Sequence, residues 1–156
     1  MTLTREQLTA ISENPKAFLN RCYKINERID AKRERIASWR LRAESTSVTL
    51  SHDSGMSGGG YKQSIVANSV VAMLSLEEEI EAEIQELLNI EKEIEVAINE
   101  LLTNSVHKVL LEMRYMNHFR MEEIAARLGY AFRWVQRLHG KALKNLKEAA
   151  LSALET

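Results

Sequence analysis

A heptad repeat in the middle of the chain limits the folds open to it. Apolar side chains recur every seven residues over five heptads, at Val66, Met73, Ile80, Leu87, Ile94 and Leu101. We assign the alternate positions of the same face to Val70, Ile84 and Ile98. A seven-residue repeat gives a helix one apolar seam, which has to be covered by another helix. The segment therefore predicts a long helix with a coiled-coil-like face.

A second apolar seam precedes this one. Apolar residues recur at alternating steps of four and three at Phe18, Cys22, Ile25, Ile29, Ile36, Trp39 and Ala43, and Lys32 occupies the one polar position in the series. This spacing predicts a helix of about 30 residues, and Asn14-Pro15 marks its start because proline suits the first turn of a helix. The Gly/Ser-rich stretch 46–60 predicts a flexible loop between the two helices. Together they predict a long antiparallel helical hairpin over residues 15–103, preceded by an N-terminal segment, 1–14, in which Leu8 and Ile11 fit a short amphipathic helix.

The charges are distributed in blocks. Residues 77–100 contain ten glutamates and one lysine, whereas residues 101–156 contain nine Lys/Arg and five Glu. The glutamates lie mainly off the seam, and we favour a solvated helix face for them. The alternative is that they pair with the first helix, whose cations are Arg28, Lys32, Arg33, Arg35, Arg40 and Arg42. The C-terminal third has the sign needed to meet a polyanion.

Residues 104–156 predict a helix-turn-helix module. Such a module needs a turn residue that tolerates positive φ between two helices packed at a steep angle. Gly129 supplies that residue, and Ala125 is small where the second helix has to come close. Four apolar residues have the spacing that lets the two helices share one core: Ile124, Leu128, Val135 and Leu138.

The outer face of the second helix carries side chains that suit double-stranded DNA. These are Phe132, Arg133, Gln136, Arg137, Lys141 and Lys144. Arginine can bond bidentately to guanine and glutamine to adenine in the major groove, whereas lysine mainly neutralises phosphates. We expect Trp134 to pack against the hairpin or an adjoining helix rather than against DNA. A solvated polar face is the plain alternative for the whole set.

The C-terminal third resembles region 4 of bacterial sigma-70-type factors. The resemblance rests on Val109 to Tyr115, Glu123-Ile124-Ala125, Gly129, and Ala142-Leu143 with Leu146. The run RLHGKALKNL after a long helical hairpin is also similar to small phage-encoded regulators of the ArpU/RinA-like group. The resemblance implies promoter DNA recognition through Phe132, Arg133, Gln136 and Arg137, with Lys141 and Lys144 near the backbone. The sequence departs from the pattern at Ala131, where a capping Ser or Thr is usual, and loss of such a cap costs about 0.5–2 kcal/mol.

These features predict an all-α DNA-binding transcriptional regulator of a phage or prophage, and we expect an activator of late genes. The alternatives are a small terminase DNA-binding subunit, and a sigma-like module that binds RNA polymerase or a sigma antagonist without DNA. We expect a homo-oligomer formed through Val66, Met73, Ile80, Leu87 and Ile94. Double-stranded DNA is the expected partner, RNA polymerase is a further candidate, and no membrane contact is expected.

We expect no catalytic residues, no cofactor and no metal. His52, His107, His118 and His139 have no metal-ligand spacing with one another or with Cys22. Cys22 lies on the first seam, which favours a buried thiol over a nucleophile. A lone cysteine and an N-terminus unlike a secretion signal favour the cytoplasm of a bacterial host cell.

Overall fold

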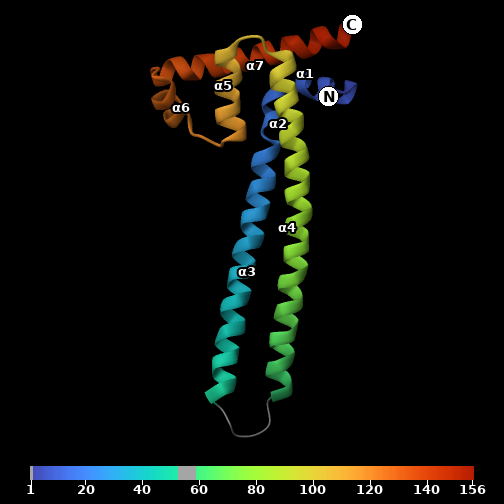
Figure 1. Cartoon of the computed structure of the whole chain (residues 1–156), viewed down its shortest axis with the longest axis vertical. Coiled ribbons are helices and arrows are strands. Elements are labelled where there is room, and N and C mark those ends of the chain that lie inside the picture. Colours follow the sequence, from blue (N-terminus) through green and yellow to red (C-terminus); the bar gives the residue numbers. More distant parts are fainter. Residues whose placement is uncertain (1, 53–58) are drawn as a thin grey trace. The chain divides into compact units, whose positions relative to one another are not determined.

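The chain is all-α over the residues that its computed structural model describes, 2–52 and 59–156, since they contain helices and no strand (Figure 1). The elements are α1 (Arg5–Glu13), α2 (Pro15–Leu19), α3 (Arg21–His52), α4 (Gly59–Leu101), α5 (Ser105–Leu111), the π-helix η1 (Glu112–Met116), α6 (Met121–Leu128) and α7 (Phe132–Glu155). Contacts divide the chain into two compact units, one of residues 25–86 and one that combines Met1–Lys24 with Leu87–Thr156. The predicted boundaries at 14/15 and 103/104 divide the chain into consecutive segments. The observed units do not, because one of them combines both ends of the chain.

The N-terminal helix forms where the sequence predicts it. The Thr4 hydroxyl accepts a hydrogen bond from the Gln7 N–H, and the Gln7 side chain accepts one from the Thr4 N–H. This capping box satisfies two donors that a helix start leaves free. Asn14 then ends α1 and caps α2, with Pro15 in the first turn of α2.

The predicted first helix of the hairpin is divided into two. Helix α2 ends at Leu19, Asn20 follows as its C-cap, and α3 begins at Arg21. Asparagine competes for backbone hydrogen bonds through its side chain, which makes it a weak residue in a helix interior. The apolar steps continue across the break, so periodicity alone does not reveal it.

In the unit of residues 25–86, α3 and α4 run in opposite directions. Arg28 and Lys32 both pair with Glu83, at 2.8 and 2.6 Å, and Arg40 pairs with Glu77 at 3.5 Å. The partner's number falls as the number on α3 rises, as antiparallel helices require. For Glu77 and Glu83 the interpretation as pairs with the first helix is confirmed. The interpretation as a solvated face is wrong for Glu83, which is buried, whereas the Glu77 side chain remains 48% exposed.

The seam of α4 within this unit differs from the predicted one. Ile80 is buried, but Val70 is 43% exposed, and the buried alternate positions are Ser69, Leu76 and Glu83. Together with the predicted heptad positions, these residues recur at alternating intervals of three and four, as a coiled-coil seam requires. Polar residues occupy two of them, so a search for apolar side chains picks a neighbouring position instead. The assignment of Val70 to the seam is therefore wrong.

Part of the predicted loop is helical. The loop prediction begins at residue 46, whereas α3 continues to His52 and α4 already includes residues 59 and 60. Residues 53–58 lie outside the described residues. Serine and threonine cost a helix only a few tenths of a kcal/mol each, and the run 46–52 contains no glycine to add to that cost.

The other unit is built around α7. Helices α1, α5 and α6 all pack against it (Figure 1). Its buried residues are Val135, Leu138, Ala142, Leu146 and Ala150, at the spacing of one helix face. From α6, Ile124 and Ala125 complete this core, as the sequence predicts. Among the described residues, no helix has an apolar stretch long enough to cross a membrane.

Candidate nucleic-acid interface

A left-handed glycine joins α6 to α7. Gly129 has φ 72° and ψ 28°, a conformation that costs other residues energy. The N–H groups of Gly129 and Tyr130 both donate to the carbonyl of Ala125, the Tyr130 bond at 3.1 Å. These bonds satisfy a carbonyl that the helix end would leave free and fix the direction in which the chain enters α7.

The outer face of α7 is a row of cations. At 100° per residue, Arg133, Arg137, Gly140 and Lys144 fall within about 60° of one another, on the side opposite the buried residues; we call these four residues the α7 stripe. All four are exposed. Residues 132–147 contain five Lys/Arg and no Asp/Glu. Among the described residues no carboxylate pairs with Arg133 or Arg137, and Lys144 has only a long contact of 4.0 Å with Glu148.

The remaining predicted residues flank this stripe. Gln136 and Lys141 are exposed, and Phe132 is 40% exposed. All six predicted DNA-binding side chains are therefore accessible, although at 100° per residue Phe132 and Lys141 lie on opposite sides of the helix. The structure corrects the expectation for Trp134, which is 42% exposed rather than packed beneath another helix. The ammonium of Lys141 lies 5.4 Å from the centre of the Trp134 ring, on the same helix.

The start of α7 has no side-chain cap. Ala131 occupies the N-cap position without a side-chain hydrogen bond, as its identity predicts. Its carbonyl accepts from the N–H groups of Trp134 and Val135, at 3.0 and 3.1 Å. At a helix start, the N-cap side chain usually accepts a hydrogen bond from one of the first N–H groups. The alanine side chain cannot accept one, so Phe132 and Arg133 have no such acceptor for their N–H groups.

A buried tyrosine contacts a half-buried histidine of α7. The Tyr115 hydroxyl lies 2.7 Å from Nε2 of His139, and the two rings are stacked at 5.7 Å. Burial, with Lys16 and Arg114 nearby, lowers the pKa of His139 to about 4, and burial raises the pKa of Tyr115 to about 12. Both groups are therefore neutral at pH 7. His139 is a structural residue, and its position on the inner side of α7 keeps it from the α7 stripe.

The connection from α5 to α6 contains two features that the sequence analysis missed. The last turn after α5 is the π-helix η1, and His118 beyond it has φ 59°, which is rare for a residue other than glycine. The Tyr23 hydroxyl donates to the carbonyl of Arg114, and the Tyr23 ring meets His118 edge-on at 4.5 Å. Histidine is among the residue types enriched at positive φ, but its identity alone does not predict this turn.

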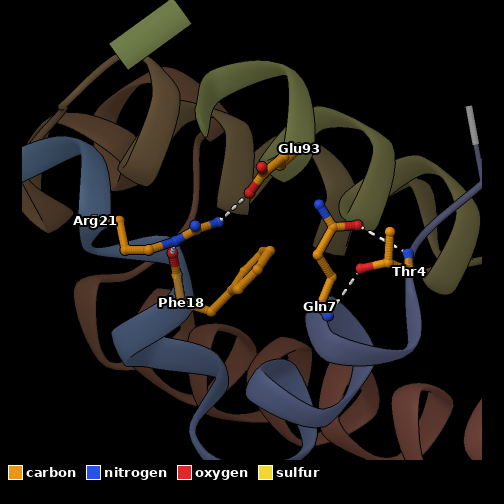
Figure 2. Close-up of polar contacts among 5 residues, drawn as sticks. All are labelled: Thr4, Gln7, Phe18, Arg21 and Glu93. Atoms are coloured by element: carbon orange, nitrogen blue, oxygen red, sulfur yellow. Dashed lines mark hydrogen bonds and ion pairs between the residues drawn. The ribbon is translucent and has the colours of Figure 1, made fainter. Parts of the chain in front are cut away.

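A shallow groove of about 690 Å³ lies elsewhere on the same unit, between α1, α2 and α4. Figure 2 shows polar contacts among five of the residues that line it. The guanidinium of Arg21 bonds to Glu93 at 2.8 Å and to the Phe18 carbonyl at 3.0 Å, and it lies over the Phe18 ring at 4.2 Å (Figure 2). Thr4 and Gln7 are committed to the α1 capping box. The polar groups drawn in Figure 2 therefore already have partners within the chain, and the exposed carboxylates of Glu6 and Glu13 line the groove beside them.

The thiol that could act as a nucleophile is buried, and the described residues bring no metal-binding cluster together. Cys22 is buried, as predicted, and desolvation raises the pKa of its thiol to about 11. A thiol with that pKa is almost entirely protonated at pH 7 and is a poor nucleophile. Over residues 2–52 and 59–156, no group of three or more His, Cys, Asp or Glu side chains is placed to hold a metal ion.

The predicted oligomerisation residues lie partly inside the chain. Ile80 and Ile94 are buried, whereas Val66, Met73 and Leu87 are half-buried. The exposed apolar residues of the same helix include Val70, Val71 and Leu74. Much of the predicted seam is thus covered by the chain's own helices.

Comparison with known proteins places the helices of this surface in one family. Residues 46–147 match the family described as "Protein of unknown function (DUF1492)". The chain belongs to the DUF1492 family. The matched residues include all of α4, α5 and α6 and the whole α7 stripe, but not α1 or α2. No curated protein matches the chain, and no solved structure matches it. The outer face of α7 is therefore part of the DUF1492 region, whereas the groove in Figure 2 is lined mainly by residues outside it.

Proposed function

We propose that the chain is a sequence-specific transcriptional regulator that binds double-stranded DNA. In this proposal α6, the Gly129 turn and α7 act as a helix-turn-helix attached to a long antiparallel helical hairpin, and α7 lies in the major groove. The observation that carries the proposal is the α7 stripe, whose two arginines are exposed and have no acidic partner among the described residues. We further propose that the regulator activates late genes of a phage or prophage in the host cytoplasm.

The positions along α7 support different roles for its cations. A helix is about 10–12 Å across, and the major groove is about 12 Å wide, so the first two turns of α7 fit among the base edges. Arg133, Gln136 and Arg137 lie in those turns and have bidentate groups for guanine and adenine. Lys141 and Lys144 follow one to two turns later, where the helix leaves the groove. Their ammonium groups suit phosphates, which position the protein without reading sequence.

Selection of bound sequences from a random duplex pool tests the proposal. Enrichment of one sequence is the expected result. On that site Arg137→Ala should cost about 1–3 kcal/mol and relax the preference at one base position. Lys144→Ala, the comparison variant, should weaken binding to all sequences and reduce the salt slope by about one unit. A pool that emerges unenriched, or binding that does not change with salt, contradicts the proposal.

One observation favours a protein partner for the same surface. Tyr130, Phe132 and Trp134 are each at least 40% exposed at the start of α7, and exposed aromatic side chains are enriched at protein interfaces. RNA polymerase is the candidate partner. A complex with polymerase that Phe132→Ala disrupts, in a chain that does not bind duplex DNA, would favour this function over the first.

We also propose that the protein is a homo-oligomer. Of the predicted contact residues, Val66, Met73 and Leu87 retain accessible surface, while Ile80 and Ile94 are already buried. Light scattering at micromolar concentration tests this directly. A mass near the 17.8 kDa of one chain would refute it.

A further inference from the structure

Gly140 occupies a position where nothing within the chain requires glycine. It is the ninth of the 24 residues of α7, and glycine in a helix interior is less favourable than alanine. Its φ is not positive, in contrast to that of Gly129. A Cβ atom built on Gly140 meets no atom within 4 Å. Neither backbone conformation nor internal packing therefore explains the missing side chain.

The location of Gly140 supplies a second observation. It lies in the α7 stripe, with Arg137 three residues before it and Lys144 four residues after it. On this face no side chain covers the helix backbone at Gly140. Exposed cations lie one turn before it and one turn after it. A glycine often marks a place where another molecule approaches the backbone closely. The cations make that molecule an anionic one.

We propose that Gly140 is the point where the sugar-phosphate backbone of duplex DNA comes closest to α7, with Lys144 holding a phosphate one turn further along. This inference rests on the proposed function. Gly140 lies about 12 Å along the helix axis from Phe132, at 1.5 Å per residue, which places it just beyond the two turns proposed to lie among the base edges. When the first turn of α7 reaches the base edges, a DNA strand at the groove wall passes Gly140. A side chain there would push that strand away.

Two substitutions at Gly140 separate folding from binding. Alanine and leucine are both good helix formers, so Gly140→Ala and Gly140→Leu should fold. The thermal midpoint of Gly140→Ala should rise by about 2–4 °C. The dissociation constant for the selected duplex should nevertheless increase about tenfold for alanine, and further for leucine. The matched control is Ser152→Ala, which changes helix propensity at an exposed site on α7 away from the stripe and should leave affinity unchanged.

The pattern of loss distinguishes the outcomes. A backbone contact carries no base information, so both Gly140 variants should weaken binding to the selected duplex and to random duplex by the same factor. Parent-like affinity in both variants overturns the inference while the proposed function stands. A loss confined to the selected duplex also overturns it, because Gly140 would then face a base edge. Failure of the unsubstituted protein to bind any duplex overturns both.

Discussion

Replacing Lys32 with methionine tests whether a buried ion pair stabilises the association of α3 with α4. The Lys32 Nζ lies 2.6 Å from Oε1 of Glu83, and the side chains are only 14% and 7% exposed. Oε2 of Glu83 is buried with no hydrogen-bond partner among the described residues. Without Lys32, the Glu83 carboxylate still pairs with Arg28, whose side chain is 62% exposed. The Glu83 side chain itself remains almost entirely shielded from water.

The expected loss is about 3 kcal/mol. Removing one partner of a buried pair costs about 3–5 kcal/mol, because the other charge remains away from water, and the Arg28 contact places this case at the lower end. For a chain of this size each kcal/mol moves the thermal midpoint by about 2–4 °C. Circular dichroism at 222 nm should therefore show Lys32→Met melting about 6–12 °C below the parent.

Two controls make the result specific to burial. Arg40→Met removes a pair with Glu77 in which both side chains are about half exposed or more, so its cost should be about 0–1 kcal/mol. The double variant Lys32→Met with Glu83→Leu removes both charges and should recover most of the lost stability. If Lys32→Met melts within a degree of Arg40→Met, the buried pair does not contribute as argued.

Three further predictions concern the rest of the chain. Tyr115→Phe removes the hydroxyl that bonds to His139, and denaturant unfolding should show a loss of about 1 kcal/mol; an unchanged midpoint would contradict that bond. The folded-state pKa of His139 is about 4, below its ordinary value of 6.5, so its contribution to stability is complete above pH 6.5 and is lost as pH falls toward 4. A His139→Gln variant should lose less stability over that pH range, and an identical pH profile would contradict the assignment. Leu74→Glu places a charge at a site that is 55% exposed; it should leave the melting midpoint of a monomer unchanged, and a lowered particle mass would assign Leu74 to the oligomer contact.

Local signals predicted much of the fold. Leu8 and Ile11 lie in the short helix α1 that their spacing predicts, Pro15 begins α2, and Gly129 adopts the left-handed conformation that its place after Leu128 suggests. Each of these depends on a few adjacent residues, and the same residue types produce the same local geometry in most folds. The outer face of α7 was predicted for the same reason, because helical spacing alone assigns its residues to one side.

Features that depend on distant residues were missed. The seam positions of Ser69 and Glu83 are polar, and only the partner helix, with Lys32 opposite Glu83, explains their burial. His118, which has a positive φ, packs against Tyr23, a residue far away in the sequence. The large apolar indole of Trp134 favours a position under another helix. In the structure its ring instead lies beside Lys141, about two turns further along the same helix. Periodicity in one segment contains no information about these partners.

The length of α7 affects how this protein can be divided into working fragments. The helix carries the α7 stripe on its first half and continues to Glu155, where its buried Leu146 and Ala150 belong to a core that α1 helps to form. A fragment that begins at residue 104 would keep every cation of the stripe but lose α1, including the fully buried Ile11. Its α7 would then expose an apolar strip to water, which favours aggregation. A soluble fragment that carries the α7 stripe therefore has to retain α1, although α1 lies more than a hundred residues before the stripe in the sequence.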